Sequence, residues 1–497
     1  MTNNDMALHQ TNLDFFPNSL VSNRNVEYGL FHTKEKNRLA VFINNGSSDL
    51  DEFEGTASEF ISGNFLDCPL NTRNARVLRS RLEWLQPRPL ELNTSAGLGD
   101  RIGLATPGHV RAVQAVDGIS PIFAQQSIRE MERTNRTPQQ VMDDATWGIF
   151  QEGWQGGVGA DADHLKTPED IDACLHAGYT FFTIDPGAHV NCQAETADLL
   201  ALQELASSLP LEICPESSGL SGREIDIEGR KIKYDTSTLL KAAIKYGRVV
   251  NHVALMYRHL VACAGKQPFE IEVSIDETDQ PTSLEEHFYI ASELKRLGVI
   301  WVSLAPRYIG RFEKGVDYIG DLQVFEKEFD GHAAVARYFG GYKLSLHSGS
   351  DKFSIYPIVN RLAKGKVHLK TAGTSYLEAL RTIASSNPDL FVQIYRFARN
   401  RYKTDRVSYH VSAELSRAPQ TEDVMEPSSL LDQFDAREIL HVTFGSVLTA
   451  KNEDGSSQFY EKLMSALQSD SESYAENLKR HFIRHFQYFS RGSRKVN

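Results

Sequence analysis

The sequence predicts an α/β fold: a (β/α)8 barrel of the TIM type with a small N-terminal α/β extension and a helical C-terminal region. Eight short apolar runs alternate with amphipathic stretches between residues 90 and 375, and helical crossovers make consecutive strands parallel. Eight such units are the number that closes a barrel. Almost every run also ends in charged or amide residues, as expected if the strand ends meet at one active-site mouth. A doubly wound open sheet shows the same alternation and is the alternative fold.

The predicted strands are short runs rich in β-branched and aromatic residues, bounded by turn signals. In chain order they cover residues 90–94, 119–125, 158–164, 179–185, 269–276, 299–306, 342–348 and 367–373. Helix-start signals, such as a threonine followed by proline, open the stretches after residues 105 and 166. The glycine-punctuated segment 217–235 predicts a β-hairpin inserted into the fourth crossover.

Three regions follow from this pattern. Residues 1–88 are predicted to form the N-terminal α/β cap, and residues 89–375 form the catalytic barrel. Residues 376–497 contain four amphipathic stretches with helical periodicity. We expect that last region to be helical and to pack on the barrel.

Composition and charge exclude several classes of function. The chain carries 53 Lys and Arg against 65 Asp and Glu, for a formal net charge of −12, so it repels nucleic acids and anionic membranes. The N-terminal sequence lacks the basic and apolar regions of a secretion signal, and no apolar run is long enough to span a bilayer. The five cysteines show no CxxC spacing. We expect a cytoplasmic protein with reduced thiols, and the sequence leaves open whether it forms a homo-oligomer.

Ionisable residues at the ends of the predicted strands are the candidates for chemistry. Asp163 and His164 close the third run, and a bend there can turn both side chains toward the mouth. His347 ends the seventh run, and His368 shares a strand face with Lys370 on the eighth. Imidazole is a common ligand of Zn, Mn, Co and Ni. Each histidine could instead be a structural residue.

Glu272 lies inside the fifth run, where an ionised carboxylate is costly unless it is paired, protonated or bound to a metal. By the two-residue period of a strand it shares a face with Glu270, Ser274 and Asp276. The alternative is an exposed strand face. The string GLGDRIG at residues 97–103 does not have the spacing of a dinucleotide fingerprint, so the sequence offers no convincing nicotinamide site.

Several longer strings closely resemble one family. GLGDRIGLATPGHVRA, PIFAQQSIRE, GADADHLKTPED, FEIEVSIDET and LSLHSGSDKFSIYP are similar, in this order, to strings of the tagaturonate/fructuronate epimerase family. The resemblance runs from about residue 92 to past residue 441. It implies a divalent-metal-dependent, cytoplasmic enzyme that interconverts D-tagaturonate and D-fructuronate in hexuronate catabolism. It also implies positions around the sugar acid for Gln126, Ser127, Asp185, Arg307 and Lys370.

The implied reaction inverts a carbon β to the ketone, whose C–H is not acidic. Retro-aldol cleavage beside that carbon, rotation of the aldehyde and re-addition would invert it, with a divalent metal (Zn, Mn, Co or Ni) as Lewis acid. The expected ligands are His164 and His347, with His368 a weaker third. Asp163 and Glu272 would exchange protons on the two faces of the sugar. Glu272 could also ligate the metal.

Two other functions fit the same residues. A metal-dependent aldolase or ketose isomerase acting on another sugar acid would use the same site but form different products. A barrel that binds sugar acids without catalysis would need no metal and would give no turnover. Product analysis separates these hypotheses. Arg307 and Lys370 offer positive charge for a substrate carboxylate, but either could be a structural ion pair.

Overall fold

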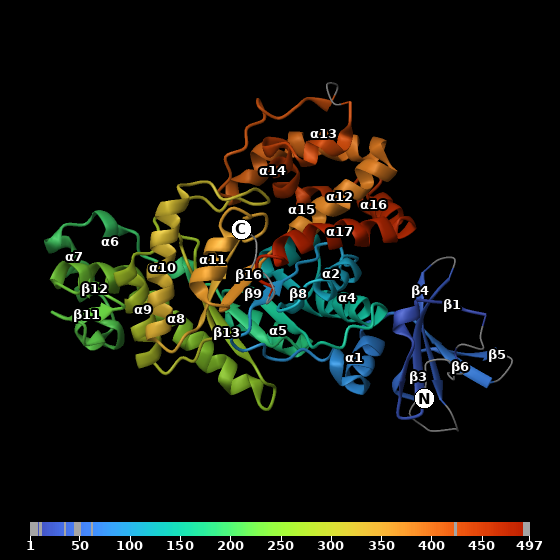
Figure 1. Cartoon of the computed structure of the whole chain (residues 1–497), viewed down its shortest axis with the longest axis horizontal. Coiled ribbons are helices and arrows are strands. Elements are labelled where there is room, and N and C mark those ends of the chain that lie inside the picture. The colour runs from blue at the N-terminus through green and yellow to red at the C-terminus, as the bar shows by residue number, and fades with distance from the viewer. Residues whose placement is uncertain are drawn as a thin grey trace.

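The computed structural model describes residues 8, 12–33, 36–43, 51–60, 63–421 and 425–490. A barrel occupies the centre of the molecule, with an antiparallel sheet on one side and a group of C-terminal helices above it (Figure 1). One large hydrophobic cluster runs through the barrel, the helices around it and the C-terminal helices. A smaller cluster lies within the N-terminal sheet.

Eight parallel strands close the barrel in the order β10, β13, β14, β15, β16, β7, β8, β9. The closed sheet confirms the predicted (β/α)8 fold and rules out the open doubly wound sheet. The strands are β7 (Ser95–Gly97), β8 (Ser120–Ser127), β9 (Gly159–Leu165), β10 (Phe181–Ile184), β13 (Glu270–Ile275), β14 (Ser303–Pro306), β15 (Lys343–Leu346) and β16 (Val367–Lys370).

The first predicted strand was wrong in position. Residues 90–94 precede β7 and lie at the N-terminal end of the barrel, where the carboxylate of Glu270 accepts the backbone N–H groups of Leu90 and Glu91, each at 2.8 Å. Glu91 has φ +54°, a left-handed conformation that interrupts an extended strand. Leu90 is buried at the base of the barrel and does not join its wall, whereas Leu92 is exposed.

Helices follow the strands as the sequence predicts, and three of them (α4, α5 and α9) begin with capping boxes, at Thr137, Thr167 and Ser283. The helices around the barrel are α2 (Thr106–Gln114), α3 (Ile128–Thr134), α4 (Pro138–Gln151), α5 (Pro168–Ala177), α8 (Thr236–Ala264), α9 (Leu284–Arg296), α10 (Leu322–Tyr338), α11 (Tyr356–Ala363) and α12 (Thr374–Ser386).

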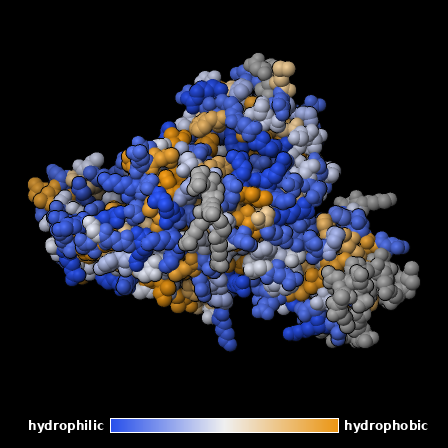
Figure 2. Space-filling view, viewed as in Figure 1, coloured by the Kyte–Doolittle hydropathy of each residue, from blue (hydrophilic) through white to orange (hydrophobic). Residues whose placement is uncertain are grey.

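The crossover between β10 and β13 carries an insertion. It contains α6 (Gln193–Thr196), α7 (Leu199–Ser207) and the predicted hairpin, whose strands are β11 (Glu224–Ile227) and β12 (Arg230–Lys233). Exposed leucines of this insertion include Leu199, Leu200 and Leu211. Figure 2 shows a small hydrophobic patch at the end of the molecule where α7 lies, and other apolar patches scattered over this face.

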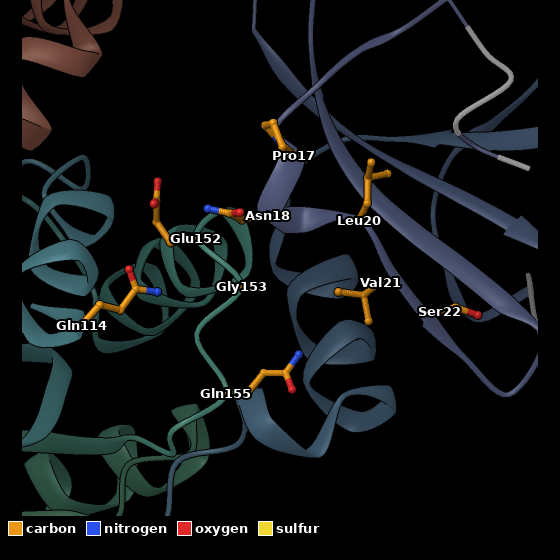
Figure 3. A pocket seen from close by; sticks show the side chains of 9 residues that line it. All are labelled: Pro17, Asn18, Leu20, Val21, Ser22, Gln114, Glu152, Gly153 and Gln155. Atoms are coloured by element: carbon orange, nitrogen blue, oxygen red, sulfur yellow. The ribbon is translucent and has the colours of Figure 1, made fainter. Parts of the chain in front are cut away.

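The N-terminal region forms a six-stranded antiparallel sheet followed by one helix. Its elements are β1 (Asp14–Phe15), β2 (Val21–Asn23), β3 (Val26–His32), β4 (Asn37–Ile43), β5 (Thr56–Phe60), β6 (Gly63–Cys68) and α1 (Thr72–Arg81). A hollow of about 470 Å³ lies between this sheet and the end of α4 (Figure 3). Glu152 in its wall is paired with Arg111 at 3.0 Å, so we assign this hollow no chemistry.

The C-terminal region is helical, as predicted, with α13 (Pro388–Asp405), α14 (Phe434–Val442), α15 (Phe444–Thr449), α16 (Tyr460–Ser469) and α17 (Ser471–Phe486). Helix α17 packs against α2 and α12. Gly108 of α2 allows this close approach, because a Cβ atom there would lie 2.6 Å from the Cβ of Leu478. None of the described helices is both long and apolar enough to cross a membrane.

Candidate active site

A cavity of about 370 Å³ opens at the carboxyl ends of the barrel strands. Its wall combines residues that follow β9, β13, β14 and β15 with the C-terminal segment 408–412. The ionisable side chains in this wall are Arg129, His164, Asp276, Glu277, Asp279, Arg307, Tyr308, Arg311, Glu313, Lys314, His347, Tyr409 and His410. The C-terminal region therefore covers the mouth and contributes to the cavity as well as packing outside the barrel.

The end of β9 carries the predicted pair Asp163 and His164. His164 has φ +55°, and the pairing of β9 with β10 shifts register between Ala162 and Leu165. This bulge breaks the alternation of faces, so adjacent residues approach each other, with His164 Nε2 3.7 Å from Asp163 Oδ1. The predicted bend is present, and it brings both side chains to the barrel mouth.

Asp185, at the end of β10, supports His164 from the other side. Its Oδ2 lies 3.4 Å from His164 Nδ1, and its Oδ1 accepts the Gly187 N–H at 2.9 Å. Burial would raise the pKa of Asp185, but the adjacent imidazole of His164 outweighs it and lowers that pKa to about 2. Asp185 is therefore ionised and fixes the orientation of His164.

His347 lies between two carboxylates. Its Nε2 is 2.7 Å from Glu272 Oε1, and its Nδ1 is 3.0 Å from Asp276 Oδ1. Burial would lower the pKa of His347, but Asp276 and Glu272 overcome that effect and raise it to about 10. The ring of His164 stands 5.1 Å from that of His347, centroid to centroid. The structure thus brings the two predicted imidazole ligands side by side.

Lys370, at the end of β16, is held inside the barrel by three carboxylates. Its Nζ lies 2.5 Å from Asp163, 3.0 Å from Asp161 and 3.0 Å from Glu272. Burial opposes the charge of the lysine, but these carboxylates raise its pKa. The pKa of Glu272 is well below its usual range, because Lys370 and His347 outweigh the effect of burial. Lys370 is therefore an ion-pair centre beneath the mouth.

His368 lies deeper in the barrel than the other two histidines. Its Nδ1 is 2.9 Å from Ser95 Oγ, and its Nε2 is 3.9 Å from Asp161 Oδ2. The ring is fully buried, and burial lowers its pKa. Among the described residues that line the mouth cavity, His164 and His347 are present and His368 is not. The geometry separates His368 from the pair to which the sequence analysis assigned it.

The remaining predicted substrate residues take different positions. Gln126 makes hydrogen bonds with Arg136 and Thr134, on the helix side of β8. Its neighbour Gln125 faces the barrel interior and donates to Asp163 Oδ2 at 3.0 Å. Ser127 caps α3 by accepting the Glu130 N–H. The alternation of the strand therefore turns Gln125, and not Gln126, toward the barrel interior.

Arg307 and Lys314 are cations in the wall of the mouth cavity. The guanidinium of Arg307 lies 3.4 Å from the carbonyl of Thr278 and 3.3 Å from that of Tyr308. Among the described residues, no carboxylate lies within ion-pair distance of Lys314 Nζ, and burial together with the nearby Arg129 lowers the pKa of this lysine. The sequence analysis missed Lys314 because it lies in a long loop after β14, away from any strand end.

The donor set at the mouth fits a divalent metal in its chemistry. Asp185 holds His164 through Nδ1 and Glu272 holds His347 through Nε2, which is the carboxylate–histidine arrangement typical of metal sites. A metal bound here would replace the imidazole protons on the two ring nitrogens that face Asp163 and Asp276. Among the described residues, three ligand atoms within 4.8 Å of one another occur in two groups, neither of which includes His164 or His347: Asp172, His259 and Cys263, and Asp351, His481 and His485.

A closed barrel with ionisable side chains gathered at one mouth defines an enzyme of the (β/α)8-barrel class. The model of the tagaturonate epimerase family matches residues 16–489 of the chain. The chain belongs to this family, as its motifs predicted.

The relatives agree with this assignment. The chain is 43% identical over 460 residues to a tagaturonate/fructuronate epimerase of Thermotoga maritima, covering 92% of this chain and 93% of the relative. The native crystal structure of fructuronate-tagaturonate epimerase UxaE from Cohnella laeviribosi superposes with a TM-score of 0.91 at 35% identity, covering 97% of each chain. A crystal structure of the same enzyme with one glycerol matches equally well. Family membership confirms the enzyme class expected from the sequence.

Proposed function

We propose that the protein is a divalent-metal-dependent epimerase that interconverts D-tagaturonate and D-fructuronate by retro-aldol cleavage and re-addition. The observation that carries the proposal is the pairing of His164 with His347 at the mouth, each held by its own carboxylate. Family membership supplies the substrate class. The metal rests on the geometry of the site, and the reaction route rests on the chemistry of a carbon β to the ketone, whose C–H is not acidic.

His164 and His347 would hold the metal, which when bound would act as a Lewis acid on the ketone and hydroxyl oxygens of the sugar. Asp185 and Glu272 would orient these imidazoles. Glu272 has no exposed surface, so we assign it this positioning role, together with holding Lys370, instead of contact with the sugar.

Inversion needs a proton-exchanging group on each side of the reacting carbon. Asp163 lies beside His164, and Asp276 lies beside His347. The pKa of each is lowered because the charges of these histidines, and of Lys370 for Asp163, outweigh burial. Both are therefore ionised and ready to accept the hydroxyl proton. We assign the two roles to Asp163 and Asp276, replacing the pair of Asp163 and Glu272.

The carboxylate of the sugar acid requires a cation in the cavity wall. Lys314 is half-buried in this wall and has no ion-pair partner among the described residues, so a bound carboxylate would restore its charge balance. Arg307 lies in the same wall. Lys370 already faces three carboxylates, which makes it unsuitable for a fourth.

The first test removes and restores the metal. The protein is stripped with a chelator, single divalent ions (Zn, Mn, Co or Ni) are returned, and D-fructuronate is followed by NMR. We expect D-tagaturonate to form only after an ion is restored, with total sugar conserved. Accumulation of three-carbon fragments would indicate an aldolase, and full activity after complete metal removal would refute metal dependence.

The second test concerns the metal ligands. His164→Ala and His347→Ala should each lose bound metal and epimerase activity together, with unchanged circular dichroism. His368→Asn is the matched comparison, because this ring lies beneath the mouth; it should retain its metal. A variant of His164 or His347 that retains stoichiometric metal would remove that residue from the site.

The third test concerns recognition of the sugar carboxylate. Lys314→Met should lower kcat/KM for D-fructuronate by about tenfold or more, the size expected when a charged hydrogen bond is lost. Arg311→Met is the control, because Arg311 is exposed and already lies 3.5 Å from Glu313. With a neutral ketohexose as substrate, the two variants should not differ. A loss in Lys314→Met of the same size on both sugars would argue against carboxylate recognition.

A further inference from the structure

A second group of potential metal ligands lies on the outer surface of the barrel, away from the mouth. Asp172 belongs to α5, and His259 and Cys263 belong to α8, which packs against α5. His259 and Cys263 are four residues apart and therefore share one helix face. All three side chains reach solvent: Asp172 and Cys263 are exposed, and the side chain of His259 is 29% exposed.

The contacts of this group converge on one nitrogen atom. His259 Nε2 lies 2.8 Å from Asp172 Oδ1 and 3.7 Å from Cys263 Sγ. In a Cys–His–Asp catalytic relay, the acid and the nucleophile contact opposite ring nitrogens. Here both contact the same nitrogen, so the acid cannot support proton transfer from the thiol. The three side chains are instead arranged to chelate a cation. The cation would replace the proton on His259 Nε2, between Asp172 and Cys263.

We propose that Asp172, His259 and Cys263 form a surface site for a thiophilic divalent cation, and that Zn²⁺ is the preferred ion. Zn²⁺ binds thiolate, imidazole and carboxylate at about 2.0–2.3 Å, and tetrahedral angles then place ligand atoms about 3.3–3.7 Å apart. The observed Sγ–Nε2 distance of 3.7 Å already falls there. The Nε2–Oδ1 distance of 2.8 Å has to open by about half an ångström, which the exposed Asp172 side chain permits. Solvent would fill the fourth position.

The buried group of Asp351, His481 and His485 is less suitable, although its ligand atoms also lie within 4.8 Å of one another. His485 Nε2 already accepts the backbone N–H of Asp351 at 2.9 Å. Asp351 is also paired with Arg437 at 3.0 Å, whose charge disfavours a second cation. At the surface site all three donor atoms are available once the imidazole proton and the thiol proton leave.

Binding at this site would join α5 to α8 and would consume the thiolate of Cys263. Two measurable consequences follow. Zn²⁺ should raise the midpoint of thermal unfolding, because it binds only the folded arrangement. It should also slow alkylation of Cys263, because the thiolate is the reactive form and the metal occupies it.

The test uses Co²⁺ as a spectroscopic substitute for Zn²⁺ on the chelator-stripped full chain. Thiolate bound to Co²⁺ gives a charge-transfer absorption in the near ultraviolet, and the mouth site proposed above contains no cysteine. We expect a Co²⁺ titration to produce this band, with an intensity at saturation of one thiolate site per chain, and Zn²⁺ to displace it. Cys263→Ser should abolish the band while epimerase activity and its metal requirement stay as in the wild type. Failure of the mouth site would not alter the band, so the two proposals fail separately.

Matched variants make the ligand set falsifiable. His259→Ala and Asp172→Asn should each weaken Co²⁺ binding by about tenfold or more. Cys214→Ser, at a half-buried cysteine outside the group, should leave both the band and the affinity unchanged. Absence of the band in the wild type, its persistence in Cys263→Ser, or unchanged affinity in both His259→Ala and Asp172→Asn would overturn the site.

Discussion

Lys370 and Lys343 both lie inside the barrel, and burial affects them with opposite results. Leu344 pairs with Val367 between β15 and β16, so Lys343 lies several residues below Lys370. Three carboxylates surround the Lys370 ammonium group and raise its pKa. Among the described residues, only Ser95 Oγ lies within hydrogen-bond distance of Lys343 Nζ, at 3.2 Å. Burial lowers the pKa of Lys343 despite the more distant Glu270 and Glu272. The number of adjacent carboxylates decides the outcome, because burial penalises both charges.

Two buried histidines, His347 and His109, also differ in pKa according to whether carboxylates lie beside them. His347 lies between Glu272 and Asp276 at the barrel mouth, and its pKa rises to about 10. His109 lies in the helical layer, where its Nε2 is 2.8 Å from Ser375 Oγ and its ring meets the edge of Phe482. Burial lowers the pKa of His109 to about 4. The mouth stabilises charge, whereas the helical layer excludes it.

The largest expected effect comes from removing the charge of Lys370. Lys370→Met leaves Asp161, Asp163 and Glu272 buried without their shared cation, so we expect a loss of about 3–5 kcal/mol in the free energy of unfolding. Lys343→Met removes a charge that burial already disfavours, and it should cost much less. Urea unfolding of both variants measures the difference. Equal losses would show that the carboxylates do not distinguish the two lysines.

The next effect is on acid stability. Because the folded-state pKa of His109 is about 4 and the ordinary value is 6.5, the unfolded chain binds the extra proton first as the pH falls. Protonation of His109 in the unfolded chain therefore lowers the free energy of unfolding as the pH drops from about 6.5 to about 4, by on the order of 3 kcal/mol in total. His109→Asn should show a shallower fall in unfolding free energy over this range. An identical slope in the variant would place the acid sensitivity in other groups.

The smallest effect concerns the base of the barrel. Glu270→Gln keeps one acceptor oxygen for the two backbone N–H groups of residues 90 and 91 and removes the negative charge below Lys343. We expect a loss of about 1–2 kcal/mol, with epimerase activity close to the wild type because the mouth is unchanged. Denaturant unfolding and the NMR assay measure both. A large loss of activity would link the base of the barrel to the chemistry.

Local periodicity was enough to predict the strand and helix order, the barrel, the inserted hairpin and the helical C-terminal region. It also indicated His164 and His347, because each lies at the end of an apolar strand, and Glu272, because a carboxylate inside an apolar strand needs a partner. The first strand was misplaced because Leu90 is buried for a different reason: it lies at the barrel base, where its backbone N–H donates to Glu270. An apolar run indicates that a segment is buried, but it does not by itself indicate that the segment pairs as a strand of the sheet.

Sequence alone determined the architecture, which depends on the repeated alternation of strand and helix patterns, and the family, which depends on contiguous motif strings. Tertiary structure decided which side chains share the site. The bulge at His164 and the strand alternation that turns Gln125 inward depend on register with neighbouring strands. Lys314 and the segment 408–412 reach the mouth from distant parts of the chain. The charge states of Lys370 and His347 depend on carboxylates from other strands, because electrostatic interactions act over distances in space and not along the sequence.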